Sequence, residues 1–126
     1  VTVDIVTNSH DTTDLNVLNV LARYQMKAFY AAYDKEYKDV RNRATFRYFE
    51  YQKAENATDA QVLSLHTKMS VLGDDVIIGS ANADIRSYMM DTNNGVFVRG
   101  AKDFVKQYTS VLIIILYRTR SQQRAC

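Results

Sequence analysis

The sequence feature that most restricts the fold is a long amphipathic segment that lies between two β-prone runs. Residues 1–6 are mostly β-branched and lead into a polar turn, and residues 45–51 (TFRYFEY) are rich in aromatic side chains. Between these runs, apolar side chains recur every three or four positions over residues 15–38, which is the period of an α-helix. The order strand, helix, strand predicts an α/β fold.

The same alternation continues through the middle of the chain. Residues 63–72 are predicted to form one strand, residues 73–75 (GDD) a turn, and residues 76–78 the return strand of a hairpin. The remaining predicted elements are a short helix at residues 85–90, a strand at residues 95–98, and a helix at residues 101–108 that continues through the apolar run at residues 111–116. The β-branched residues of that run also suit a strand, but its place at the end of an α/β unit favours the helix.

Length and composition limit the class of protein. The chain has 126 residues, of which 47% are hydrophobic and 24% are charged, so it corresponds to one small globular domain and not to a disordered chain. Its one cysteine cannot form an internal disulfide, and no Cys–His spacing suggests a metal site. The longest apolar run, residues 111–117, is shorter than the roughly 20 residues needed to span a bilayer. The net charge of +2 does not by itself indicate nucleic-acid binding.

Two short motifs, HTK and GSAN, carry the candidate chemistry. On a strand, His66 and Lys68 of the first motif would point to the same face, about 7 Å apart. This pairing suits phosphate, because the ammonium binds phosphoryl oxygens while the imidazole attacks phosphorus or moves a proton. In the second motif, Ser80 and Asn82 offer a hydroxyl and an amide as neutral donors to developing charge. The predicted hairpin would return these donors to the end that carries His66.

These residues resemble the HKD motif of the phospholipase D superfamily, whose pattern is His-x-Lys-x-x-x-x-Asp followed by Gly-Ser-x-Asn. The sequence NADIRS at residues 82–87 is similar to a segment of the bacterial cardiolipin synthase-like branch. The TNS motif at residues 7–9 and the GVFV strand at residues 95–98 also match segments of that branch. The resemblance covers residues 1–108, and it is greatest to the second HKD half of such proteins.

Two positions depart from the family pattern. At the place of the pattern's aspartate this chain has Gly73, so the supporting role of the aspartate is assigned to Asp74. Many relatives carry a glutamate in an Asn-Thr-Glu segment before the last strand, where this chain reads DTN at residues 91–93. The carboxylate that orients the histidine is therefore replaced by an amide, or its role passes to Asp91.

The resemblance implies a metal-independent exchange of phosphodiesters that needs no cofactor. His66 attacks phosphorus to form a phosphohistidine, while the histidine of a second HKD motif protonates the leaving alcohol. Water or another alcohol then takes up the phosphoryl group. The implied catalytic residues are His66, Lys68 and Asp74, and the residues implied to bind the substrate phosphate are Lys68, Ser80 and Asn82.

The resemblance also implies how the protein is organised and what it contacts. Residues 1–126 are expected to form a single phospholipase D-like domain, a mixed sheet flanked by helices that supplies one HKD half-unit. Because Val1 lies within a predicted strand, we expect the chain to be a fragment of a longer protein or a processed one, and the resemblance to the second HKD half implies the C-terminal half of a longer protein. The second HKD half must come from a missing segment or a second copy, since His10 has no lysine two residues on and is typical of a loop histidine. The expected substrate is a phospholipid, with peripheral membrane contact and a membrane-associated or cytoplasmic location in a bacterium.

Two other functions stay open. The first is a nuclease of the same superfamily that acts as a homodimer of single-motif chains, although nucleic acid is the less favoured partner. It is favoured by the short length and by a basic cluster of Lys38, Arg41, Arg43 and Arg47. The second is a degenerate, non-catalytic module kept for assembly, which the shifted aspartate and the missing glutamate favour.

Overall fold

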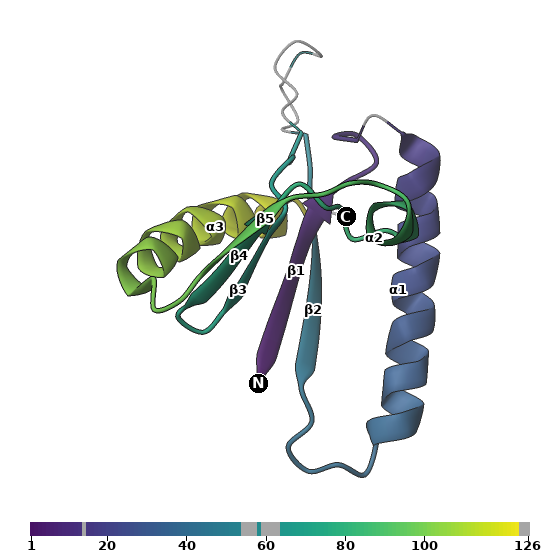
Figure 1. Ribbon diagram of the computed structural model, residues 1–126. Helices are drawn as coiled ribbons and strands as arrows, with labels where there is room; N and C mark the ends of the chain where they lie inside the picture. The colour runs from purple at the N-terminus through teal and green to yellow at the C-terminus, as the bar shows by residue number, and fades with distance from the viewer. Residues whose placement is uncertain (14, 54–57, 59–63, 124–126) are drawn as a thin grey trace. The chain divides into compact units, whose positions relative to one another are not determined.

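The computed structural model describes residues 1–13, 15–53, 58 and 64–123, and its ribbon mixes helices with strands as the α/β prediction requires (Figure 1). The chain divides into two compact units. One unit contains residues 1–65 and 118–126, and the other contains residues 66–117. Each unit has its own sheet, so the strands do not form one continuous sheet among the described residues.

The first unit is built from two strands and the helix that connects them. β1 (Thr2–Asn8) and β2 (Thr45–Tyr51) pair in parallel, and their register runs from Thr2 opposite Thr45 to Asn8 opposite Tyr51. A parallel pair needs a long crossover connection, and α1 (Asn16–Tyr37) provides it. The predicted helix and the second predicted strand are confirmed, and the first strand extends to Asn8, beyond its predicted end.

Aromatic side chains fasten α1 to β2. The ring of Phe46 meets the rings of Phe29 and Tyr33 edge to face, with centroids 5.0 Å apart in both pairs. The hydroxyls of Tyr30 and Tyr33 donate to the backbone oxygens of Phe46 (3.2 Å) and Ala44 (2.9 Å). The aromatic residues that recur along the helix therefore serve packing, and their hydroxyls fix the position of the helix along the strand.

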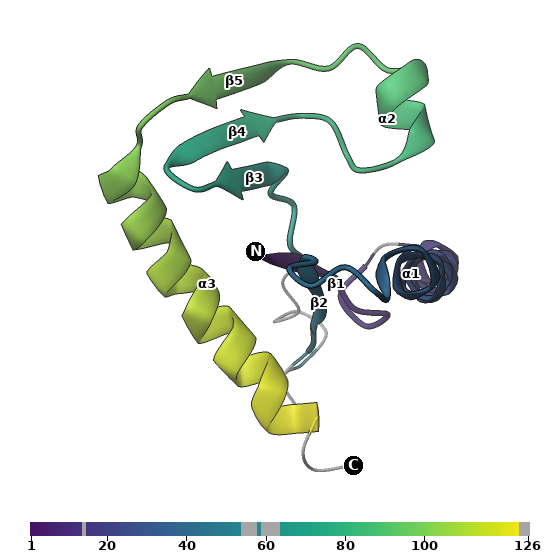
Figure 2. The ribbon, with the colours of Figure 1, turned by 90° about the horizontal axis from the view of Figure 1, so that it is seen from below.

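The second unit contains an antiparallel sheet of three strands in the order β3–β4–β5, which Figure 2 shows from below. β3 (Met69–Leu72) and β4 (Asp75–Gly79) form the predicted hairpin. Its turn requires the positive φ of Gly73, +67°, which a residue without a Cβ adopts at little cost. Val76 of β4 is fully buried and forms the centre of this small core.

The predicted strand over residues 63–72 is too long at its start. Residues 64–68 lie outside any strand, and residue 63 lies outside the described residues. The β3–β4 ladder ends where Met69 faces Ile78, and the next backbone hydrogen bond, from Gly79 to the oxygen of Lys68, lies one step beyond it. His66 and Lys68 therefore sit on an irregular segment that leads into the hairpin, and the strand argument for their common face does not apply.

The remaining elements lie where the sequence predicts them. α2 (Ile85–Met89) is a short helix, and β5 (Gly95–Val98) pairs with β4. α3 (Lys102–Gln123) continues as one helix through residues 111–116, so the helical interpretation of the apolar run is confirmed. Within the part of the chain that the structure describes, no helix combines the length and the apolar character needed to cross a membrane.

Candidate functional site

The two motifs of the candidate site meet at one end of the hairpin in the second unit. The backbone N–H of Gly79 donates to the backbone oxygen of Lys68 at 3.0 Å, one step beyond the last ladder pair. Ser80 follows directly, so the HTK and GSAN motifs lie side by side at their bases. The predicted return of the GSAN donors to the HTK end is therefore confirmed at the level of the backbone.

The lysine of the HTK motif folds back onto the motif itself. The Lys68 ammonium donates to the backbone oxygen of His66 at 2.9 Å. An ammonium has three donors, so two N–H groups stay available for an anion such as a phosphate. The His66 side chain is exposed, and its imidazole forms no hydrogen bond with any residue that the structure describes. A basic donor and a nucleophilic ring thus share one short segment that solvent reaches.

Ser80 uses its hydroxyl and its backbone to hold the segment before β5. Its hydroxyl donates to Asn93 Oδ1 at 3.0 Å and accepts from the Asn94 backbone N–H at 3.0 Å. Its own backbone N–H donates to the Asn94 oxygen at 2.9 Å. In this structure Ser80 therefore holds the GSAN segment against the residues before β5. Its direct contact with phosphate stays a prediction.

Asn93 stands at the position where the resemblance described above leads us to expect a glutamate, and both the oxygen and the nitrogen of its amide form hydrogen bonds. Its Oδ1 accepts from Ser80, and its Nδ2 donates to the backbone oxygen of Ser87 at 2.8 Å. Ser87 is buried, and its backbone N–H is capped by Asp84 Oδ1 at 2.7 Å at the start of α2. A carboxylate could not donate to the Ser87 oxygen, which gives the amide a structural reason. The sequence shows that an amide replaces the expected carboxylate, but it does not indicate the hydrogen bonds that connect Asn93 to Ser80 and Ser87.

Asp91, the other candidate for the glutamate's role, is already paired. Its Oδ1 accepts from Arg86 Nε at 3.1 Å, and this ion pair is largely exposed to solvent. The pair joins Asp91 to α2, and among the described residues the Asp91 side chain forms no hydrogen bond with the HTK or the GSAN motif. The proposed takeover of the glutamate's role by Asp91 therefore finds no contact in this structure.

Gly79 is required by the protein's own backbone. A Cβ on this residue would lie 3.0 Å from the backbone oxygen of Asn94 and 3.6 Å from the Cα of Gly95. The absence of a side chain at Gly79 therefore permits a close approach between β4 and the start of β5. The two strands come together just where Ser80 fastens them.

The two remaining predicted residues differ in where the structure places them. Asn82 is exposed and forms no hydrogen bond with the residues described, so its amide is free to meet a ligand. Asp74 lies in the turn at the other end of the hairpin, and its Oδ2 is 3.7 Å from Lys102 Nζ. Because β3 has four residues, the two ends are about 13 Å apart. The structure does not bring Asp74 close to His66. The residue at the aspartate position of the HKD pattern is Gly73, which forms the tight turn at the far end of the hairpin.

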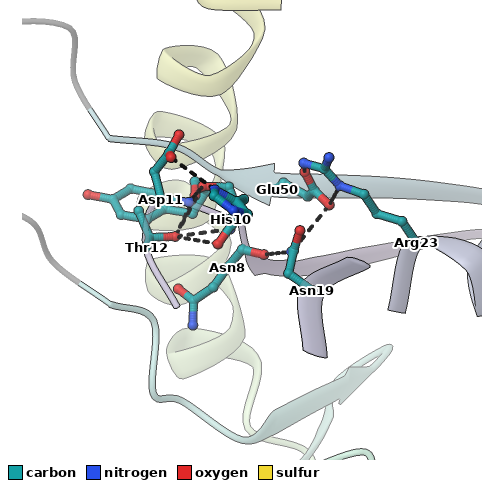
Figure 3. A network of polar contacts seen from close by, with 9 residues as sticks. Asn8, His10, Asp11, Thr12, Asn19, Arg23 and Glu50 are labelled. Carbon is teal, nitrogen blue, oxygen red and sulfur yellow. Dashed lines mark hydrogen bonds and ion pairs between the residues drawn. The ribbon is translucent and has the colours of Figure 1, made fainter. Parts of the chain in front are cut away.

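The first unit carries a second group of polar residues, at the carboxyl ends of β1 and β2 (Figure 3). The Ser9 backbone N–H and the Thr12 hydroxyl both donate to the Tyr51 oxygen, at 3.0 and 2.8 Å, and both residues are buried. His10 lies next to them on the surface, where its Nδ1 is 3.2 Å from Asp11 Oδ1. This exposed contact agrees with the interpretation of His10 as a loop histidine.

A buried carboxylate anchors the inner part of this network. Glu50 is buried and accepts from Arg23 Nε at 2.8 Å and from Arg23 Nη2 at 2.5 Å, a two-point contact. This hydrogen bonding raises the pKa of the Arg23 guanidinium. Asn19, also buried, donates to the Asn8 backbone oxygen at 2.9 Å and approaches Glu50 at 3.5 Å. The end of β1 is thereby tied to both α1 and β2.

The fold and the site together define a class of protein: a small α/β domain with one histidine–lysine motif at the end of a hairpin. The family model of the cardiolipin synthase PLD-like domain matches residues 1–113, and the chain belongs to this family. It is thus a member of the phospholipase D superfamily, a group of phosphodiesterases and phosphatidyltransferases in the broad sense. Searches of curated proteins and of solved structures gave no match to this chain.

Proposed function

We propose that this chain supplies one half of a metal-independent phosphodiester-exchanging site that acts on phospholipids. The observation that carries the proposal is the hydrogen bond from Gly79 to Lys68, which places the HTK and GSAN motifs at the same end of one hairpin. Membership of the cardiolipin synthase PLD-like family supports the phosphodiester chemistry. The cardiolipin synthase character of the family also favours a phosphatidyl group over other phosphodiesters.

The chemistry assigns one task to each exposed group. A ring nitrogen of His66 attacks phosphorus, a P–N bond forms, and the P–O bond to the leaving alcohol breaks as that oxygen takes a proton from the histidine of the second half-site. Water or an acceptor alcohol then attacks phosphorus, breaks the P–N bond and returns its proton to the second histidine. Lys68 and Asn82 stabilise the phosphoryl oxygens, and Ser80 keeps the GSAN segment in place.

Exposed apolar surface supports the need for a second half. In the sheet of the second unit, Ile77 and Phe97 are paired across β4 and β5 and therefore lie on the same face, where they are 42% and 54% exposed. Contiguous apolar surface of this kind marks an interaction face in soluble proteins. A second copy of the chain, or another segment with its own histidine, would cover such a face and complete the site. Peripheral contact with a membrane surface is part of the same proposal.

The test is turnover of phosphatidylglycerol vesicles by the full chain in the presence of EDTA, with released glycerol and newly formed cardiolipin or phosphatidate as readouts. If a second copy completes the site, activity rises with about the square of protein concentration at low concentration. His66→Ala should reduce turnover to background because it removes the nucleophile, whereas His10→Ala should keep it. Turnover that survives His66→Ala would show that the mechanism is wrong.

The nuclease alternative, which rests on the short length and on the basic cluster, loses part of its support in the structure. Arg43 is paired with Asp34 at 2.7 Å, and Arg47 is paired with Asp4 at 2.5 Å. Two of the four basic side chains in the cluster therefore face carboxylates of the protein itself, and the cluster offers less charge to a phosphate backbone than the sequence indicated. Cleavage of DNA in EDTA, without vesicle turnover, would reverse this preference. A chain that self-associates but consumes neither substrate would support the non-catalytic module.

A further inference from the structure

We propose that Asn8 is a positioning residue for His66. Its side-chain amide holds the backbone of Leu65, and it thereby fixes the peptide bond from which the nucleophile continues. This inference rests on the function proposed above for His66. It gives a task to the TNS motif, which the reaction scheme leaves without one.

The geometry is a two-point contact with a single residue. Asn8 Nδ2 donates to the Leu65 backbone oxygen at 2.9 Å, and Asn8 Oδ1 accepts from the Leu65 backbone N–H at 2.7 Å. Both hydrogen bonds are partly buried, and a third runs from Nδ2 to the Ser64 hydroxyl at 3.1 Å. An amide that pairs with both backbone groups of one residue does what a neighbouring strand would do. It restrains the two backbone torsions of Leu65.

The position of Leu65 makes this restraint important for the site. Leu65 belongs to the irregular segment 64–68, and among the described residues its own backbone has no hydrogen bond to the backbone of a strand. Its carbonyl is one half of the peptide bond whose N–H belongs to His66. Since the side chain of His66 has no hydrogen-bond partner among the described residues, the orientation of its ring depends on the backbone from which it projects.

Asn8 is itself held firmly, so it can act as an anchor. It is the last residue of β1 and faces Tyr51 in the parallel register. Its backbone oxygen accepts from buried Asn19, which lies beside Glu50, and Glu50 is fixed in turn by Arg23 (Figure 3). A polar network rooted in α1 and β2 thus ends on the residue that precedes the nucleophile.

The contact with Leu65 needs one acceptor and one donor at the distance that an asparagine side chain reaches. An aspartate keeps the shape but has no donor for the Leu65 oxygen, and a leucine has neither donor nor acceptor. A glutamine carries the same amide on one more methylene and would displace the contact. The substitutions Asn8→Asp and Asn8→Ala therefore remove one or both hydrogen bonds to Leu65.

The first test measures the backbone of the chain without any substrate. In Asn8→Ala, we expect the Leu65 amide to exchange with solvent roughly tenfold faster, while the Val6 amide in β1 stays protected. The backbone order parameter of His66 should fall from a rigid value of about 0.85 towards about 0.6. Asn42→Ala is the matched control, because Asn42 is exposed and forms no hydrogen bond with the described residues. Unchanged Leu65 exchange, or equal acceleration at Val6, would overturn the inference.

The second test uses the assembly that turns over vesicles. Asn8→Ala should lower kcat roughly ten- to hundredfold with KM within about twofold, since it misplaces the nucleophile and leaves the binding groups intact. Asn8→Asp should fall between Asn8→Ala and the unchanged chain. A raised KM at constant kcat, or an equal loss in Asn42→Ala, would contradict a positioning role. Absence of turnover in the unchanged chain would count against the proposed function, and the exchange and order-parameter measurements would still decide the role of Asn8.

Discussion

Polar side chains are buried and hydrogen-bonded at the end of the β1–β2 sheet, whereas those at the open end of the β3–β4 hairpin include exposed ones without hydrogen bonds to the described residues. At the first, Ser9, Asn19 and Glu50 are buried, and each contributes to a hydrogen-bond network. At the second, His66 and Asn82 are exposed and form no hydrogen bond with the described residues. The difference separates a region that supports from a region that presents reactive groups.

The largest expected difference between the two ends is in stability. Glu50→Ala removes a buried carboxylate and its two hydrogen bonds from Arg23, so we expect the free energy of unfolding to fall by about 2 kcal/mol. Asp91→Ala removes a carboxylate from the exposed Arg86 pair in the other unit, and less than about 0.5 kcal/mol should be lost. Urea unfolding of both variants measures this. An equal decrease in the free energy of unfolding of the two variants would contradict this difference in stability between the two regions.

A smaller effect should separate the two ends of the hairpin itself. In Gly79→Ala, the new Cβ presses on the Asn94 oxygen, and in Gly73→Ala a side chain is forced into a positive φ; each should destabilise the fold by about 1 kcal/mol. Only Gly79→Ala should also reduce vesicle turnover, because it disturbs the strand end beside Lys68. Matching turnover in the two variants would show that the catalytic end tolerates displacement.

The smallest expected effect concerns pH. Burial, and next the charge of Glu50, raise the pKa of Tyr48, so the folded chain keeps this phenol neutral where the unfolded chain ionises it. Stability should therefore fall as the pH rises above about 10, the ordinary tyrosine value, and Tyr48→Phe should weaken that fall. Tyr108, whose pKa is raised by burial, should show the same direction in Tyr108→Phe. Unfolding curves at pH 8 and pH 11 make the comparison. An unaltered pH dependence in Tyr48→Phe would contradict it.

Much of the fold follows from local patterns. The strand at residues 45–51 has the predicted bounds because β-prone aromatic residues are dense there, and the hairpin turn follows from Gly73. The start of the strand predicted over residues 63–72 could not be placed, because a β-prone pattern does not show how far its partner extends. The pairing of β4 decides that limit.

The candidate site was predictable in its residue types but not in its contacts. The HTK and GSAN motifs name His66, Lys68 and Asn82, and their common location follows from the hairpin. The pairing of Asn8 with Leu65 joins residues far apart in the sequence, and no periodic pattern indicates it. The pairing of Arg43 and Arg47 with carboxylates is likewise a product of tertiary structure, which is why charge alone overstated the basic cluster.

The fastening of Ser80 to Asn94 has a consequence for how such domains diversify. Hydrogen bonds in both directions close the base of the connection between β4 and β5, and α2 lies inside that closed loop. A loop that is closed at its base can change length or sequence at a small cost in closure entropy, while the strands beneath it stay paired. Under the function proposed above, sequence changes in this loop would alter substrate preference while His66 and Lys68, which lie outside it, stay unchanged.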